Sequence, residues 1–150
     1  MPLPLPYYFE GKVVRGYGRG GKELGCPTAN MDENLVAVLP MFQNGVYYGF
    51  AQIYGKLYSM AMSLGTNPQY NNGSRSMEIH VIGYEGPDFY NETLKGLMIG
   101  FIRKMDKYES LDALKEAIAK DISYARMATR DERGKMLRKQ FFPNMELYES

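Results

Sequence analysis

Residues 46–64 read VYYGFAQIYGKLYSMAMSL, and this stretch decides the fold class of the chain. Each half has the composition of a β-strand, and the turn at Gly55-Lys56 between them is short enough for a hairpin. The intervals between this stretch and the neighbouring strand-like segments hold no helical pattern of the length that a parallel crossover needs. The stretch therefore predicts an antiparallel β body.

The segments that flank this hairpin extend the same pattern. Strand-like runs lie at 8–15, 77–82 and 94–103, separated by clusters of Gly, Asn, Pro and Asp. Ser110 then has the character of a helix N-cap, and apolar residues recur at helical spacing over 111–126, before a polar tail. We expect a single domain, residues 1–150, built as a small antiparallel barrel or strongly bent sheet with one C-terminal α-helix.

Composition limits the kinds of partner. The chain of 150 residues carries 18 basic and 17 acidic residues, a balance that argues against nucleic acid or a membrane surface as a partner. No apolar run approaches the ~20 residues of a membrane span. Cys26 is the single cysteine and His80 the single histidine, which excludes an internal disulfide and a zinc site built from Cys and His. We expect a cytoplasmic monomer.

A glycine-rich segment, residues 16–30, reads GYGRGGKELGCPTAN and has the features of a nucleotide phosphate site. Glycines let backbone N–H groups approach an anion closely, and an Arg and a Lys add positive charge. The segment contains the letters of the dinucleotide-binding fingerprint, but Gly25 and Pro27 exclude the helix that this fingerprint must open. It also fails as a P-loop, because Glu23 stands where that motif has a Ser or Thr for Mg²⁺.

The end of this segment offers ligands for a metal ion. Thr28 and Asn30 lie two residues apart, so on an extended backbone a hydroxyl and an amide oxygen share one face. Two neutral oxygen donors there suit one hard cation. The alternative is that residues 27–30 form only a turn, in which Thr and Asn side chains bond to nearby backbone groups.

The strand-like run at 77–82 supplies the candidate catalytic group. Alternation along a strand puts Glu78 and His80 on the face opposite Met77, Ile79 and Val81. A carboxylate held on a strand suits a general base in phosphoryl transfer to an alcohol, whereas a solvent-facing Glu is the common alternative. His80 has no nucleophile or further metal ligand beside it, so a hydrogen-bonded packing role is the favoured interpretation.

Arg103 and Tyr108 bracket the turn that leads into the helix. If this turn faces a ligand, Arg103 suits a grip on a polar edge or a phosphate, and Tyr108 suits packing on a flat aromatic ring. Otherwise Arg103 is an ordinary solvated charge. We expect an exposed connection without a core contact, so that loss of Arg103 leaves the melting temperature nearly unchanged.

Taken together, these motifs resemble those of riboflavin kinases, in the stand-alone eukaryotic form. The tetrad joined to the Gly-Arg-Gly turn and the later Glu-x-His strand is the most specific part of the resemblance. The matching segments keep the same order and span nearly the whole chain: Gly18-Arg19-Gly20, Leu24-Gly25, Pro27-Thr28-Ala29-Asn30, Gly45-Val46-Tyr47-Tyr48-Gly49, Gly65-Thr66-Asn67-Pro68, Met77-Glu78-Ile79-His80 and Phe101-Ile102-Arg103.

The resemblance implies a fold and a reaction. The fold would be a six-stranded antiparallel Greek-key β-barrel with a C-terminal α-helix. ATP and riboflavin would be the substrates, ADP and FMN the products, and Mg²⁺ the metal ion, with Mn²⁺ and Zn²⁺ left open. Thr28 and Asn30 would hold the metal, and Glu78 would be the general base.

The resemblance also implies binding residues. Residues 103–108 would form a flap over the flavin, in which Asp106 stands where related enzymes can have a basic residue. A non-catalytic barrel that binds a flavin or single-stranded nucleic acid through its aromatic residues is the alternative. The nucleotide would be bound through Gly16, Lys22, Val81, Gly83 and Tyr90.

Overall fold

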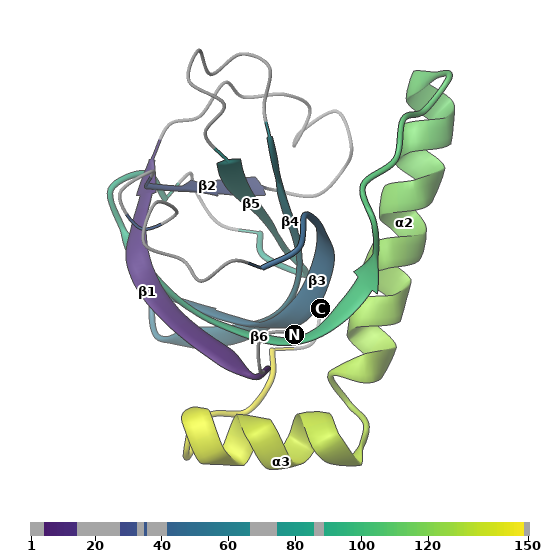
Figure 1. Cartoon of the computed structure of the whole chain (residues 1–150). Coiled ribbons are helices and arrows are strands. Elements are labelled where there is room, and N and C mark those ends of the chain that lie inside the picture. The colour runs from purple at the N-terminus through teal and green to yellow at the C-terminus, as the bar shows by residue number, and fades with distance from the viewer. Residues whose placement is uncertain are drawn as a thin grey trace.

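The protein is a closed β-barrel with helices packed on its outside (Figure 1). A computed structural model describes residues 5–14, 28–32, 35, 42–66, 75–85 and 89–148. The barrel order is β1-β2-β5-β4-β3-β6, and every pairing is antiparallel. The strands are β1 (Tyr7–Val14), β2 (Thr28–Met31), β3 (Gly45–Ile53), β4 (Lys56–Thr66), β5 (Arg75–Val81) and β6 (Thr93–Arg103).

The strand order contains a Greek key. Strands β3, β4 and β5 follow one another as neighbours, and β6 returns to lie beside β3, which gives the spatial order 6-3-4-5. The predicted six-stranded Greek-key barrel is therefore confirmed, including the hairpin at Gly55. The residues alone did not identify β2 as a strand, since Thr28 to Met31 also suits a turn.

Alternation along the strands separates an inner core from an outer face. On β5, the side chains of Met77, Ile79 and Val81 belong to the buried cluster inside the barrel. Glu78 and His80 therefore lie on the outer face, as the period of two predicts. The barrel interior is packed with side chains and the functional surface must lie outside it.

One glycine lets two strands approach inside this core. A Cβ atom at Gly96 of β6 would lie 2.2 Å from Cζ of Phe9, whose ring is buried in the inner cluster. The absence of a side chain at Gly96 thus makes room for the ring of the neighbouring strand β1. Register shifts between β3 and β6 further bend the sheet on which the outer site is built.

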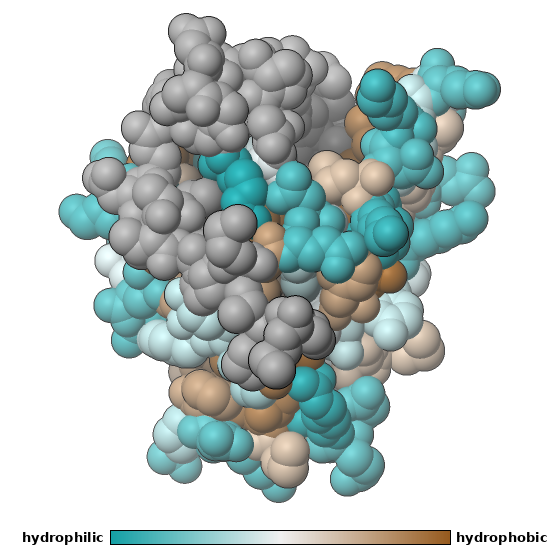
Figure 2. Space-filling model, viewed as in Figure 1, coloured by the Kyte–Doolittle hydropathy of each residue, from teal (hydrophilic) through white to brown (hydrophobic). Residues whose placement is uncertain are grey.

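Helix α2 (Leu111–Ala128) covers the outer face of β3 and β4. The side chain of Ser110 caps it by accepting a hydrogen bond of 3.1 Å from the backbone N of Ala113, which confirms the predicted start of the helix. Ala125 packs against Ala61 and Ile82 in a buried cluster. In Figure 2, hydrophilic side chains cover much of the outward side of α2, and hydrophobic patches show beside them.

A second helix, α3 (Glu132–Phe141), crosses the end of the barrel (Figure 1). The prediction of a polar tail after one helix is wrong at this point. Asp131 caps α3 by accepting a 2.8 Å hydrogen bond from Gly134 N, while Leu137 and Phe142 pack in a buried cluster with Phe50 of β3. No helix among the described ranges is long and apolar enough to cross a membrane.

Candidate active site

The register of the barrel aligns the candidate residues in a row across its outer face. Asn30 of β2 pairs with Glu78 of β5, and Glu78 pairs in turn with Ser63 of β4. Ser63 pairs with Val46 of β3, which pairs with Arg103 at the end of β6. Paired residues in antiparallel strands direct their side chains to the same face. A candidate metal ligand, base and cation, far apart in sequence, therefore occupy one line.

A second row of paired residues runs parallel to the first on the same face, two residues away along each strand. Thr28 of β2 pairs with His80 of β5, and His80 pairs with Ala61 of β4. Ala61 pairs with Tyr48 of β3. Residues of both rows form the floor of a cavity.

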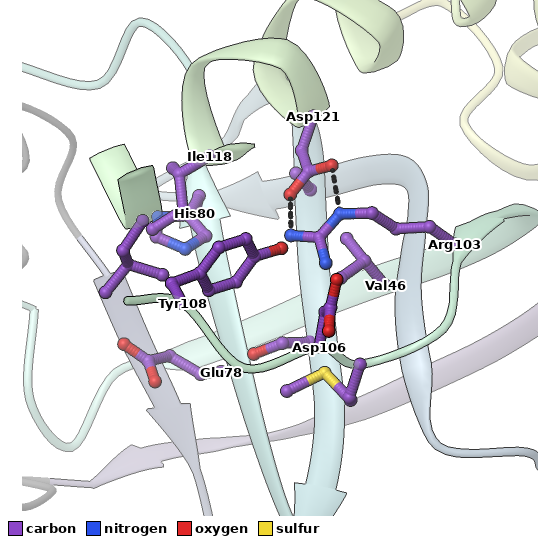
Figure 3. A pocket seen from close by; sticks show the side chains of 12 residues that line it. Val46, Glu78, His80, Arg103, Asp106, Tyr108, Ile118 and Asp121 are labelled. Atoms are coloured by element: carbon purple, nitrogen blue, oxygen red, sulfur yellow. Dashed lines mark hydrogen bonds and ion pairs between the residues drawn. The ribbon is translucent and has the colours of Figure 1, made fainter. Parts of the chain in front are cut away.

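The cavity has a volume of about 240 Å³ and lies between the barrel and α2 (Figure 3). Helix α2 forms one wall with residues spaced by a helical turn, and the β6–α2 connection (residues 104–110) forms another, running alongside α2 to its N-terminal end (Figure 1). The lining residues are Val46, Ala61, Ser63, Glu78 and His80 from β3, β4 and β5, Arg103 from β6, Met105, Asp106 and Tyr108 from the connection, and Leu114, Ile118 and Asp121 from α2.

Arg103 and Asp121 form an ion pair at the wall of this cavity. Nε of Arg103 donates a 2.9 Å hydrogen bond to Oδ1 of Asp121, and Nη2 donates one of 2.7 Å to Oδ2 (Figure 3). The Asp121 side chain is 6% exposed and that of Arg103 is 27% exposed. The hydrogen bond to Asp121 raises the pKa of Arg103, which keeps the guanidinium charged.

This ion pair corrects the expectation that Arg103 lies in a solvated connection without a core contact. Residues 104–107 are exposed, as expected, but Arg103 is held against α2 by a nearly buried carboxylate. Its guanidinium carbon also lies 5.7 Å from the centre of the Tyr108 ring. The strand end, the connection and the helix are therefore tied together at one charged pair.

His80 is buried beside this pair, 9% exposed, at the floor of the cavity. Burial lowers the pKa of His80 from 6.5 to about 4, and the Asp121 carboxylate acts in the opposite direction. The imidazole is therefore uncharged at neutral pH. The prediction that His80 is a packing residue is confirmed by its burial. The hydrogen bond that was expected with it is not found at Nδ1, which has no partner among the described residues.

Three of the candidate nucleotide-binding residues, Val81, Gly83 and Tyr90, lie at or near the end of the barrel next to this site. Strand β1 ends at Val14 and β2 begins at Thr28 in the same region. Strand β5 ends at the same place, and Gly83 follows it with a φ of +86°. The backbone around Tyr90 is fixed to the end of β1, because Asn91 N donates a 2.7 Å hydrogen bond to Val13 O.

Comparison with known proteins identifies the family. The Flavokinase family model, described as riboflavin kinase, matches residues 3–129. The chain belongs to the riboflavin kinase family. Riboflavin kinase of Homo sapiens is 44% identical over 124 residues, which cover 81% of this chain and 80% of the relative. The resemblance inferred from the motifs is thus confirmed.

Two solved structures are similar to this chain, and one of them is a riboflavin kinase. A crystal structure of riboflavin kinase from Trypanosoma brucei is similar with a TM-score of 0.66 and 28% identity, covering 88% of this chain and 82% of that one. A structure described as a macrolide-efflux protein from Streptococcus pneumoniae gives a TM-score of 0.70 and 30% identity over 81% of this chain. This chain spans only 38% of that longer chain, so the similarity concerns one part of a larger protein.

Three of the residues predicted to bind the nucleotide or the metal ion lie wholly or partly outside the described residues. Gly16 and Lys22 lie outside the described residues, and of Thr28 only the backbone is described. The Val81 side chain is fully buried in the barrel core, so only its backbone is available for contact with a ligand. Tyr90 is 37% exposed.

The cavity also contains residues that the sequence alone did not single out. Ser63 and Ala61 occupy alternate positions of β4, so the period of two in that strand was an available signal. Asp121 follows Ile118 by three residues and Leu114 by seven, which places a carboxylate on the apolar stripe of the predicted helix. A charged residue on such a stripe was the signal for a buried partner.

Proposed function

We propose that this protein transfers the γ-phosphate of ATP to the 5′-hydroxyl of riboflavin, giving FMN and ADP in a metal-dependent reaction. Membership of the riboflavin kinase family supports the reaction class. The observation that carries the assignment of roles is the row of paired residues from Asn30 through Glu78 to Arg103, which joins the proposed metal ligand to the cavity.

Glu78 is the proposed general base. Its backbone is paired on both sides, with Asn30 in β2 and Ser63 in β4, and its side chain is half-buried at the cavity. A carboxylate fixed in this way can accept the proton of an alcohol and orient its oxygen for in-line attack on a phosphoryl group. The substrate hydroxyl would lie between Glu78 and the γ-phosphate.

The proposed metal ligands fit Mg²⁺. Asn30 offers a neutral amide oxygen on the outer face, directly beside Glu78, and Thr28 belongs to the same strand two residues earlier. Mg²⁺ is commonly held by few protein oxygens together with substrate phosphates, and when bound it neutralises charge that develops on those phosphates. No group of three or more His, Cys, Asp or Glu side chains is placed to hold a metal within the described ranges, so Asn30 and Thr28 remain the candidates.

The nucleotide is proposed to bind at the adjoining end of the barrel. The glycine-rich segment that contains Gly16 and Lys22 begins after β1 and ends at β2. Backbone N–H groups of such a segment suit phosphates. The backbone of Val81, together with Gly83 and Tyr90, would line the base and ribose side, because β5 ends here.

The flavin is proposed to bind in the cavity. Leu114 and Ile118 of α2 provide apolar surface for an aromatic ring system, and Tyr108 supplies an aromatic face. A volume of about 240 Å³ is below the roughly 300–1,000 Å³ typical of sites for molecules of this size. Binding therefore requires the exposed β6–α2 connection to move, while Arg103 stays at the wall through Asp121.

A single assay tests this proposal. Purified protein is incubated with riboflavin and ATP, with and without Mg²⁺, and FMN is separated by chromatography. We expect FMN only when ATP and the divalent ion are both present, with parallel reactions in Mn²⁺ and Zn²⁺ to decide the preferred metal. A folded protein that binds riboflavin but forms no FMN with any of the three ions would instead support a flavin-binding module. Monomeric state and cytoplasmic location remain predictions from the sequence.

A further inference from the structure

The imidazole of His80 holds a buried polar atom that no described residue satisfies. Nδ1 is buried and lacks a hydrogen-bond partner among the described residues. An unpaired buried polar atom of this kind destabilises the folded protein relative to one that is hydrogen-bonded. Native proteins contain few such atoms, and each one calls for an explanation such as a ligand that completes the bond.

The surroundings of His80 indicate where such a ligand would come from. The imidazole lines the cavity together with Tyr108 of the β6–α2 connection (Figure 3). The neighbour of His80 on β4 is Ala61, which carries no hydrogen-bonding side chain. The neighbour on β2 is Thr28, of which only the backbone is described. Among the described residues, the wall contributed by α2 near it is apolar except for Asp121, whose two oxygens both accept hydrogen bonds from Arg103.

The position of His80 relative to Glu78 limits what this ligand group can be. The two residues are two positions apart on the same face of β5, which corresponds to about 6.6 Å along a strand. This is comparable to the separation between a terminal hydroxyl and an inner hydroxyl of an extended polyol chain. A polyol whose terminal hydroxyl reaches Glu78 would therefore carry an inner hydroxyl past His80 on its way into the cavity.

We propose that His80 recognises the polyol chain of the acceptor substrate by a hydrogen bond between Nδ1 and an inner hydroxyl of the ribityl group. This inference rests on the proposed function and assigns a substrate contact within it. A hydroxyl is both donor and acceptor, so it satisfies Nδ1 in either tautomer of an uncharged imidazole. The contact selects for a hydroxylated chain and sets its register, which places the terminal hydroxyl at Glu78.

The test compares two flavins and two variants. Riboflavin carries the ribityl chain, whereas lumiflavin has the same ring system with a methyl group in its place. His80→Leu removes Nδ1 with a side chain of similar bulk, and His80→Asn keeps an amide group near the position of Nδ1. Affinities are measured by the change in flavin fluorescence, and thermal unfolding without ligand is recorded for each protein.

We expect His80→Leu to weaken riboflavin binding about tenfold, the usual order for one lost hydrogen bond, and to leave lumiflavin binding unchanged. His80→Asn should recover most of the riboflavin affinity. The unliganded His80→Leu protein should be at least as stable as the wild type, because the substitution removes an unsatisfied polar atom. A purely structural imidazole predicts the reverse, with lower stability and unchanged selectivity between the two flavins.

Equal affinity of wild type and His80→Leu for riboflavin would overturn the proposal, and so would an equal loss for riboflavin and lumiflavin. If His80→Leu does not fold, His80→Asn and the wild type are compared on riboflavin analogues that each lack one inner hydroxyl. One analogue should then bind the wild type about tenfold more weakly, and if none does, the contact does not exist. Formation of FMN by the wild type is measured separately, so failure of the kinase proposal is distinguishable from failure of this contact.

Discussion

Glu78 owes its candidate role to its position in the sheet. It lies on the outer face of a strand that is paired on both sides, so its carboxylate is held between Asn30 and the cavity. Strand geometry provides this precision. Side chains on paired strands are also less free to shift than side chains on loops.

Glu78→Gln should abolish most turnover while preserving both substrates' binding. The amide keeps the shape of the side chain but cannot accept a proton, and loss of a general base typically slows the reaction by ~10²–10⁴. Single-turnover FMN formation measures the rate, and flavin fluorescence with calorimetry of Mg²⁺-ATP measures binding. Near-normal turnover would exclude Glu78 as the base.

Asn30→Leu should weaken Mg²⁺-ATP binding more than riboflavin binding, because it removes one proposed metal oxygen beside Glu78. Gln52→Leu is the matched control. This substitution also replaces a half-buried amide on the outer face of the barrel. Gln52 pairs with Leu57 and Lys95 and lies far from the cavity. Calorimetry with Mg²⁺-ATP that shows the same affinity for both variants would return Asn30 to a structural role.

The depressed pKa of His80 predicts how stability depends on pH. Its value of about 4 in the folded protein lies below 6.5, so between these values the unfolded chain binds more protons. The free energy of unfolding should then decrease as the pH falls from 7 to 5, by roughly 2 kcal/mol from this group. Urea denaturation at both pH values measures it. His80→Asn should lack this component, and an identical pH dependence in both proteins would contradict the assignment.

At the scale of elements, the ion pair between Arg103 and Asp121 joins the end of β6 to α2. Arg103→Ala would leave the Asp121 carboxylate nearly buried without its partner, and such a change typically costs about 1–3 kcal/mol. Both α2 and the cavity wall should loosen. This expectation replaces the one from the sequence, in which loss of Arg103 leaves stability unchanged.

A double-mutant cycle separates the pair from the individual side chains. Chemical denaturation is measured for Arg103→Ala, Asp121→Ala and the double variant, and we expect a coupling energy of about 1–3 kcal/mol because the two groups are in direct contact. If the two effects simply add, the ion pair does not stabilise the junction. In that case the flap role of Arg103 regains support.

The elements also show what the sequence could and could not predict. Strand alternation and the Ser110 cap were sufficient for the β5 face and the start of α2, because both depend on local geometry. Helix α3 escaped prediction because its buried contacts are few, chiefly Leu137, and a glycine lies inside it. Gly134 is explained only by the tertiary fold, since a Cβ atom there would lie 2.4 Å from Thr129 O.

The candidate site shows the same limit. Thr28, Asn30 and Glu78 were singled out from their own chemistry, but the pairing that places Asn30 opposite Glu78 is a property of the barrel register. Asp121 acquires its importance only when α2 is laid on the barrel beside Arg103. The chemistry of one side chain can be read from its own residue type. Which side chains meet depends on the order of the strands in the barrel, and no single segment encodes that order.

At the scale of the whole molecule, the two proposed binding regions lie on different parts of the barrel. The end of the barrel where β1 and β5 finish is proposed to bind the nucleotide, and the cavity under α2 is proposed to bind the flavin. Glu78 lies on the outer face of β5 and lines the cavity. A change that fills the cavity should therefore remove one ligand and spare the other.

Ser63→Phe tests this division, because Ser63 lines the cavity from the middle of β4 and a ring there would occupy the space proposed for the flavin. A ligand at a hundredfold excess over its Kd stabilises the folded state by about 2.7 kcal/mol, which raises Tm by roughly 5–10 °C for a chain of this size. We expect the variant to lose the shift caused by riboflavin and to keep the shift caused by Mg²⁺-ATP. Gln52→Phe, with the same ring placed on the outer face away from the cavity, should keep both shifts. A riboflavin shift that persists in Ser63→Phe would place the flavin elsewhere on the molecule, and equal loss of both shifts would show that the two regions are one continuous site.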